Sequence, residues 1–152
     1  MSIFDSLNTS ASSLTAQRLR MDVVSSNIAN AQTTRADMNA DGTYEPYRRK
    51  MVTMEPKGDN FQSFLDQAVN SKTSRTGSGV KVSQITEDDS PFKQKYNPNH
   101  PDAGPDGYVE MPNVDPLKEM VDLMGASRSY EANVTAINAS KNMLMKALEI
   151  GK

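Results

Sequence analysis

The acidic run Asp37–Gly42 (DMNADG) has the spacing of the first half of a calcium-binding EF-hand loop. The twelfth position of such a loop should be a glutamate that binds the ion through both carboxylate oxygens, but Arg48 occupies it here. A cation at that position opposes calcium binding, and Pro46 interrupts the helix that would follow the loop. The sequence therefore predicts an Asp-Gly turn before a strand in place of a calcium site.

The single histidine, His100, lies in the loop segment NPNHPDA of a chain that has no cysteine. One histidine makes a poor metal site, and general-base catalysis would require an orienting partner. We interpret His100 as a residue that caps its own turn, and Asp88 and Asp89 as turn residues. The short basic run Arg48–Lys50 is interpreted as a solvated or interface edge of a strand. The sequence therefore predicts no catalytic residue, no metal site and no cofactor.

Composition excludes several further classes of protein. The 152 residues carry a net charge of −2, and the pI of about 5.4 argues against a general nucleic-acid or anionic-membrane surface. Hydrophobic residues make up 36% of the chain, which has no Trp, so a large core is not expected. No window approaches 18 apolar residues, and the start MSIFDSLNTS lacks the features of a secretory signal. We expect no small-molecule substrate, and no removed Sec-type peptide if the protein leaves the cytoplasm.

Helix-breaking residues define the organisation of the chain. All eight prolines lie between Pro46 and Pro116, and six of the eight glycines lie between Gly42 and Gly107. Because proline costs about 3 kcal/mol inside a helix, the two ends are helix-permissive and the middle is rich in turns. The sequence predicts helices over 4–31 and 116–150, the second with Asp115 as N-cap and Pro116 at its first position.

Both predicted helices carry a heptad-like line of residues, which we call the seam. The N-terminal seam contains Leu7, Leu14, Met21 and Ile28, with Phe4, Ala11, Arg18 and Ser25 between them. The C-terminal seam contains Met120, Leu123, Ser127, Tyr130, Val134, Ile137, Lys141, Leu144 and Leu148. These patterns predict an antiparallel coiled-coil pair in which Leu7, Leu14, Met21 and Ile28 engage Tyr130, Val134, Ile137 and Leu144.

The C-terminal helix carries a second, partial apolar stripe. It consists of Leu117, Val121 and Met124, and further on Met143, Ala147 and Ile150. A two-helix hairpin buries only one seam, so the second stripe indicates contacts with neighbouring molecules; cover by the middle of the chain at one end is the alternative. We expect head-to-tail contacts, which generate filaments.

The middle of the chain is expected to be extended. The pattern predicts strands over Thr43–Glu55, within Gly77–Asp89 and over Tyr108–Met111, a weak helical turn at Phe61–Val69 and a loosely ordered tip at Ser71–Gly79. The expected fold class is α+β: a helix in segment 1–35, a small β-rich module in 36–112 with a flexible loop at 57–79, and a helix in 113–152.

Long motifs at both ends resemble a known family. Ser6–Arg35, with NIANAQTT at Asn27–Thr34, resembles the N-terminal signature of bacterial flagellar rod and hook proteins, and Pro112–Lys152 resembles their C-terminal signature. The segment Tyr96–Asp115 is most similar to the proximal rod proteins of the flagellar basal body.

This resemblance implies a structural component of the drive shaft that transmits torque from motor to hook. Its location would be the basal body in the cell envelope, reached unfolded through the flagellar type III export apparatus. The partners implied are further copies of itself, other rod proteins, and membrane-ring and export-apparatus components at the rod base. Its terminal helices would line the inner wall of a hollow rod, with the middle module facing outward.

The expected assembly interface combines both seams, the second stripe and two asparagines. Its residues are Leu7, Leu14, Met21, Asn27, Ile28, Asn30, Leu117, Val121, Met124, Tyr130, Val134, Ile137, Leu144 and Leu148. Asn27 and Asn30 are predicted to hydrogen-bond across the helices and set their register, with a frayed helix end as the alternative.

Two other functions would use the same sequence differently. A non-polymerising helical-hairpin adaptor, or an export-chaperone-like binding module, would be folded and monodisperse alone. A peptidoglycan-active enzyme would need paired carboxylates in a cleft, and the candidates Asp88, Asp89 and Asp102 are all expected on turns.

Overall fold

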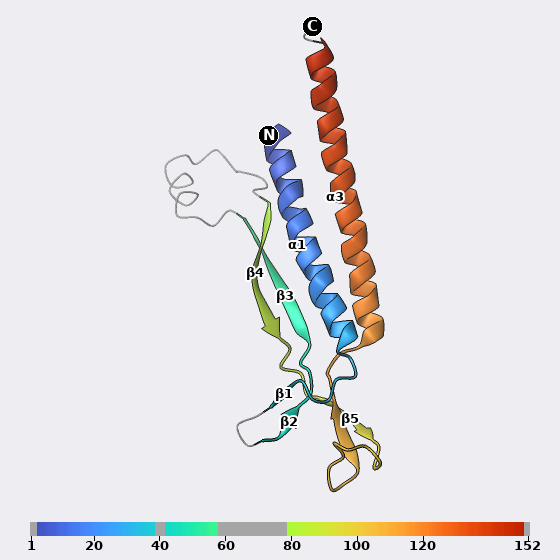
Figure 1. Ribbon diagram of the computed structural model, residues 1–152. Coiled ribbons are helices and arrows are strands. Elements are labelled where there is room, and N and C mark those ends of the chain that lie inside the picture. Colours follow the sequence, from blue (N-terminus) through green and yellow to red (C-terminus); the bar gives the residue numbers. More distant parts are fainter. Residues whose placement is uncertain (1–2, 39–41, 58–78, 151–152) are drawn as a thin grey trace, which may run out of the picture. The chain divides into compact units, whose positions relative to one another are not determined.

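The computed structural model describes residues 3–38, 42–57 and 79–150. Over these residues it is an α+β structure with two long helices and three small sheets (Figure 1). The elements in chain order are α1 (Ile3–Ala29), β1 (Asp37–Met38), β2 (Tyr44–Glu45), β3 (Lys50–Pro56), β4 (Val80–Glu87), β5 (Lys93–Tyr96), β6 (Tyr108–Met111) and α3 (Pro116–Ile150). No helix in these described ranges is long and apolar enough to cross a membrane.

Both predicted helices are confirmed, with small changes at their ends. α1 ends two residues earlier than expected, and α3 covers the expected range. The predicted cap of α3 is also confirmed, since Oδ1 of Asp115 accepts a hydrogen bond from the Leu117 backbone N–H at 3.1 Å. The carbonyl of Asp115 accepts from the Glu119 N–H at 3.0 Å, which closes the first helical turn.

The buried side of α1 differs from its predicted seam. Ala16, Val23, Val24 and Asn27 are buried, whereas the seam residues of α1 are half-buried or exposed. A heptad seam describes burial against one partner helix. α1 instead hydrogen-bonds both to α3 and to the strands, so its buried surface is broader than one line.

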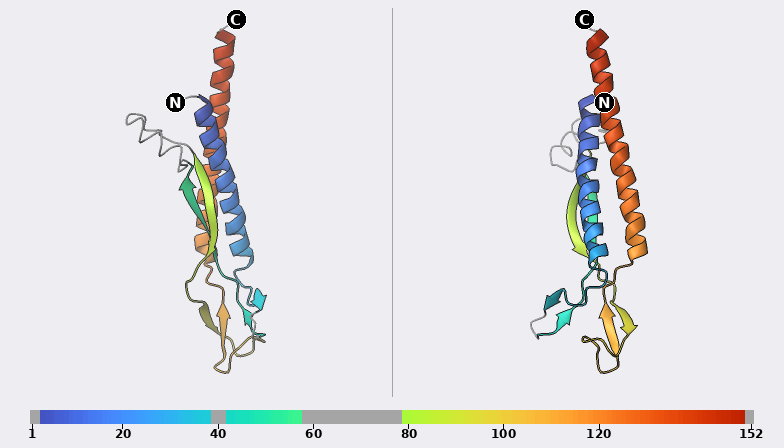
Figure 2. Two further views of the ribbon diagram at one scale, coloured as in Figure 1. Left: turned by 90° about the vertical axis from the view of Figure 1, so that its left-hand side faces the viewer. Right: turned by 45° about the vertical axis from the view of Figure 1, so that its right-hand side comes forward.

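The strands are each paired with one neighbour. β1 pairs with β2, β3 with β4, and β5 with β6, so every sheet is the two-stranded ribbon seen in Figure 2. β1–β2 and β5–β6 are antiparallel, with Met38 opposite Tyr44 and Lys93 opposite Met111. The predicted strand at Tyr108–Met111 is confirmed, and β4 lies within the second predicted segment.

Three strand predictions need correction. Asp37 and Met38, expected in a loop, form β1 and pair with β2. The single strand expected over Thr43–Glu55 is divided into β2 and β3, because buried Pro46 has no N–H to donate and the Tyr47 N–H bonds instead to the Thr33 carbonyl at 3.1 Å. β5 was not predicted, because its four residues (KQKY) are all exposed and show no alternation. The helical turn expected at Phe61–Val69 and most of the tip at Ser71–Gly79 lie outside the described residues.

The chain forms two compact units. The first comprises Met1–Arg20, Thr53–Gln84 and Ala126–Lys152, and the second comprises Met21–Val52 and Ile85–Gly125. In the first unit, Oγ of Ser12 accepts from the Val80 N–H at 3.1 Å, and Nδ2 of Asn133 donates to Oγ of Ser13 at 3.1 Å. The second unit holds most of the buried side chains, including Val23, Val24, Tyr47, Val109 and Val114. The three segments expected from the sequence stay a prediction.

Candidate assembly site

Asn27 occupies the centre of the second unit, and its side chain has no solvent exposure. Its Nδ2 donates to the Lys50 carbonyl at 2.8 Å and to Oε2 of Glu119 at 3.0 Å. Its Oδ1 accepts from the Lys50 N–H at 2.9 Å and from the Tyr47 hydroxyl at 3.0 Å. One amide therefore joins α1, the start of β3 and the first turn of α3 with its full hydrogen-bonding capacity used.

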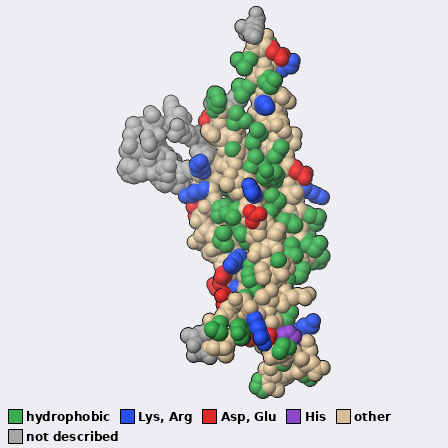
Figure 3. All heavy atoms as spheres, viewed as in Figure 1, with side chains coloured by type: hydrophobic (Ala, Val, Ile, Leu, Met, Phe, Trp, Pro, Cys, Tyr) green, Lys and Arg blue, Asp and Glu red, His purple; other side chains and the backbone are tan. Residues whose placement is uncertain are grey.

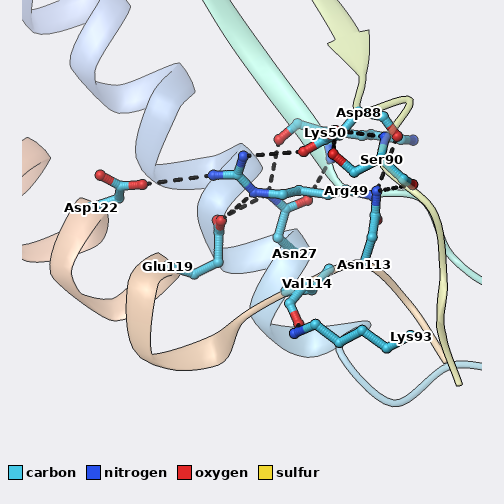
Figure 4. A network of polar contacts seen from close by, with 10 residues as sticks. All are labelled: Asn27, Arg49, Lys50, Asp88, Ser90, Lys93, Asn113, Val114, Glu119 and Asp122. Carbon is cyan, nitrogen blue, oxygen red and sulfur yellow. Dashed lines mark hydrogen bonds and ion pairs between the residues drawn. The ribbon is translucent and has the colours of Figure 1, made fainter. Parts of the chain in front are cut away.

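Arg49 provides the positive charge of the same network (Figure 4). Its Nε donates to Oε1 of Glu119 at 2.6 Å, and its other nitrogens lie 3.6 Å from Asp88 and 3.7 Å from Asp122. Partial burial lowers the pKa of Arg49, because it removes water from the charged guanidinium. The hydrogen bond and charge of Glu119 and the charge of Asp88 raise the pKa by more, so the net shift is upward. Of the basic run Arg48–Lys50 only Lys50 lies on a strand, since β3 begins there, and the solvated interpretation is wrong for Arg49, whose side chain is only 16% exposed.

Glu119 is the acidic partner of both Asn27 and Arg49, and it is fully buried. It lies in the first turn of α3, where the helix dipole favours a negative charge. The paired cation and the Asn27 amide compensate the loss of water around this carboxylate. The buried polar groups thus satisfy one another only when α1, β3 and α3 come together.

Asn113 and Lys93 extend the network toward β5 and the segment before α3. Oδ1 of Asn113 accepts from the Arg49 N–H at 2.8 Å, and Nδ2 donates to the carbonyls of Asp88 and Ser90 at 3.0 and 3.2 Å. Nζ of Lys93 donates to the Val114 carbonyl at 2.8 Å. Asp88 is a turn residue as predicted, because it accepts from both the hydroxyl and the N–H of Ser90, and these bonds lower its pKa.

His100 caps its own turn, as predicted. Its Nδ1 accepts from the Asp102 N–H at 3.2 Å. The Asp102 carboxylate accepts from Nε of Arg35 at 2.7 Å and from the Thr34 hydroxyl at 2.9 Å, and the bond from Arg35 is the main cause of its lowered pKa. The structured part of the chain contains no group of three or more His, Cys, Asp or Glu side chains that could hold a metal ion.

The two asparagines of the expected interface have different roles. Asn27 does bond across the helices, as predicted. Asn30 does not, because its Nδ2 donates to the Ser26 carbonyl of the same helix at 2.9 Å and its Oδ1 accepts from the Thr33 hydroxyl at 3.2 Å. Asn30 therefore stabilises the end of α1, which corrects the expectation for this residue.

The apolar residues of the expected interface fall into two groups by exposure. Eight of the seam residues are half-buried: Leu7, Leu14, Met21, Ile28, Tyr130, Val134, Ile137 and Leu144. The seam residue Leu148 is instead 74% exposed. Those exposed on α3 include Leu117, Val121, Met124 and, near its end, Leu148.

We call Leu117, Met120, Val121 and Met124 the α3 ridge. Their exposed fractions lie between 52% and 74%, and Figure 3 shows hydrophobic side chains gathered along α3.

Comparison with known proteins gives a consistent result. A family model described as "Flagella basal body rod protein" matches residues 7–36, and another described as "Flagellar basal body rod FlgEFG protein C-terminal" matches residues 106–150. The chain is 63% identical to the flagellar basal-body rod protein FlgC of Bacillus subtilis over 152 residues, which is the full length of both chains. It is 45% identical to FlgC of Borreliella burgdorferi, covering 99% of this chain and 98% of that one. It is 39% identical to FlgC of Escherichia coli O6:H1 over the whole of both chains.

Proposed function

Because the chain belongs to the FlgC family of flagellar basal-body rod proteins, we propose that its two terminal helices pair and attach it to neighbouring subunits of the rod. Membership of this family makes the protein a structural component of the basal-body rod and not an enzyme.

The pairing is proposed to be an antiparallel coiled coil. Support comes from two hydrogen bonds between the helices, Ser13 with Asn133 and Asn27 with Glu119. Ser13 precedes Asn27 by 14 residues, and Asn133 follows Glu119 by 14, so both bonds fit one antiparallel register. In this proposed register Leu14 would face position 132, between Tyr130 and Val134 of the predicted seam, whereas Met21 would face position 125 and Ile28 position 118, outside the predicted set of partners.

The observation that carries the proposal is the exposure of the α3 ridge. Four large apolar side chains at spacings of three, one and three residues form one face of the helix, and each is more than half exposed. Covering them would remove apolar surface from water and stabilise the rod at roughly 25 cal/mol per Å² buried. In this proposal each subunit transmits torque through helix contacts with copies of itself and with other rod proteins.

The route to the rod is proposed from the same family membership. The chain leaves the cytoplasm through the flagellar export apparatus, without a cleaved signal peptide, and takes its place in the proximal rod within the periplasmic part of the cell envelope. It meets membrane-ring and export components at the rod base. Seams interrupted by polar residues favour order on assembly, since α1 and α3 gain burial from neighbours. The segments 1–35 and 113–152 then form the axial core, and 36–112 forms the outer module.

The experiment compares export with incorporation. A chain lacking residues 116–152 should be absent from isolated rods, even where it is still exported into the medium. Normal incorporation of the truncated chain would refute helix-mediated assembly. A second measurement tests the adaptor alternative: our proposal expects helicity and sedimentation to rise with protein concentration, whereas an adaptor would be folded and monodisperse at every concentration.

A further inference from the structure

A groove in the second unit has walls made by α1 and by the β3–β4 pair. It encloses about 480 Å³ and is lined by Asp22, Val23, Ser26, Lys50, Ile85 and Glu87. Val23 forms a buried apolar floor, and Ile85 is an aliphatic side chain that remains 47% exposed. Asp22 and Glu87 add two exposed carboxylates at the rim, against the single ammonium group of Lys50. The groove is thus apolar inside and mainly acidic at its edge.

The α3 ridge has the complementary properties. Leu117, Val121 and Met124 present exposed apolar side chains, and the unbranched side chain of methionine in particular adapts to an irregular apolar surface. Lys118 is exposed beside the ridge. At about 100° per residue it lies on the flank of the helix, within reach of an acidic rim when the ridge is seated in a groove.

The ridge cannot fill the groove of its own chain. Glu119 points toward α1, because it accepts a hydrogen bond from Asn27. At about 100° per residue, the ridge lies on the opposite face of α3 from Glu119 and buried Ala126. The groove is lined by other residues of that same α1. Ridge and groove therefore face different directions within one unit, and their contact requires two molecules.

We infer that the α3 ridge of one copy docks into the α1–β3–β4 groove of a second copy. Such a contact joins two different surfaces, so it does not close on itself and continues as a helical polymer. A ridge-to-ridge contact would instead close a twofold dimer, which a rod cannot use for growth. The inference rests on the proposed role of α3 in assembly and adds the surface that receives it.

Cysteine cross-linking tests this contact directly, because the natural chain has no cysteine. Cells that build rods would express two distinguishable copies, one with Val121→Cys and one with Ile85→Cys, and isolated rods would be treated with a mild oxidant. A disulfide requires Cα atoms about 4.4–6.8 Å apart, so a bond between the two copies reports direct docking. Met124→Cys provides a second ridge position for use if the Val121→Cys chain fails to incorporate.

The matched control replaces Ile85→Cys with Gln84→Cys. Gln84 is exposed on the same strand, but its side chain points to the opposite face of the sheet. We expect a disulfide between copies for Val121→Cys with Ile85→Cys and loss of that product with Gln84→Cys. A disulfide between two Val121→Cys copies, or no product because a different rod protein covers the ridge, would overturn the inference.

The same preparations separate this inference from the proposed function. Incorporation of both cysteine chains without the disulfide overturns the ridge-in-groove contact and leaves helix-mediated assembly standing. Wild-type incorporation of a chain with charged residues on the ridge would overturn the proposed function itself.

Discussion

Asn27 and Glu119 lie 92 residues apart in the sequence, yet Nδ2 of Asn27 donates a 3.0 Å hydrogen bond to Oε2 of Glu119 where neither side chain is exposed. The bond joins the last turns of α1 to the first turn of α3. Arg49, on the strand side, holds the other oxygen of the same carboxylate. The network therefore ties both terminal helices to the start of β3.

Removal of the Asn27 amide tests how much this junction contributes to stability. Asn27→Ala leaves the Lys50 backbone groups without their partner and the Tyr47 hydroxyl with only the longer bond to Ser26, so we expect the free energy of unfolding to fall by about 2–4 kcal/mol. Urea denaturation followed by circular dichroism measures this loss. The control is Asn142→Ala, at an exposed position of α3, where a change below about 0.5 kcal/mol is expected.

Arg49 and Glu119 should behave as a coupled pair. Arg49→Met leaves the Glu119 carboxylate buried without its cation, with an expected cost of about 3–5 kcal/mol. Adding Glu119→Leu removes the uncompensated charge, so the double variant should recover more than half of that loss. A double-mutant cycle from denaturation curves gives the coupling. Additive losses would contradict an interaction between the two charges.

The lowered pKa of Asp102 predicts a loss of stability in acid. The hydrogen bond from Arg35 favours the charged carboxylate, so this group stabilises the fold above its unfolded pKa of about 3.9. That contribution is lost as the pH falls through the lower pKa of the folded state. In melting curves from pH 7 to pH 2, Asp102→Asn should lower the melting temperature near neutral pH and reduce its decline in acid. Asp37→Asn, at an exposed position of β1, is the control; equal acid profiles for wild type and Asp102→Asn would disprove the assignment.

Two glycines near β6 offer a matched pair. Gly107 has a φ of +75°, and an added Cβ would lie 2.9 Å from Cε2 of Tyr96, whereas Gly104 has ordinary φ and no atom closer than 3.6 Å. Gly107→Ala should destabilise the β5–β6 hairpin by about 1–2 kcal/mol, and Gly104→Ala should have a smaller effect. Hydrogen exchange of the β5 and β6 amides distinguishes the two variants. Equal protection in both would show that the positive φ imposes no cost.

The two helices could be predicted because strong local signals define them. Proline and glycine are confined to the middle of the chain, and Asp115 and Pro116 determine where α3 starts. β5 gave no such signal, because its side chains are exposed and its pairing with β6 depends on the fold. The interruption between β2 and β3 was readable at Pro46, which a central strand does not tolerate.

The polar network could be predicted only in part. We predicted Asn27 at a helix end with a hydrogen bond across the helices. Its partner Glu119 could not be predicted, because Arg49 and Glu119 are both far from Asn27 in the sequence. From the sequence alone, Glu119 is an acidic residue in the first turn of a helix, as is common, and Arg49 is one of three consecutive basic residues on a predicted strand. Only the tertiary fold brings them together. The broad burial of Ala16, Val23 and Val24 likewise depends on partners on two sides of α1.

The most direct test of the account places negative charge on the α3 ridge and scores rods and culture medium separately. The double variant Leu117→Asp/Val121→Asp should still be exported but be lost from isolated rods, because carboxylates on the ridge oppose its burial against a neighbour. Gln84→Asp, at an exposed position of β4 outside both terminal helices, should incorporate normally. Wild-type amounts of the double variant in rods would contradict assembly through the terminal helices.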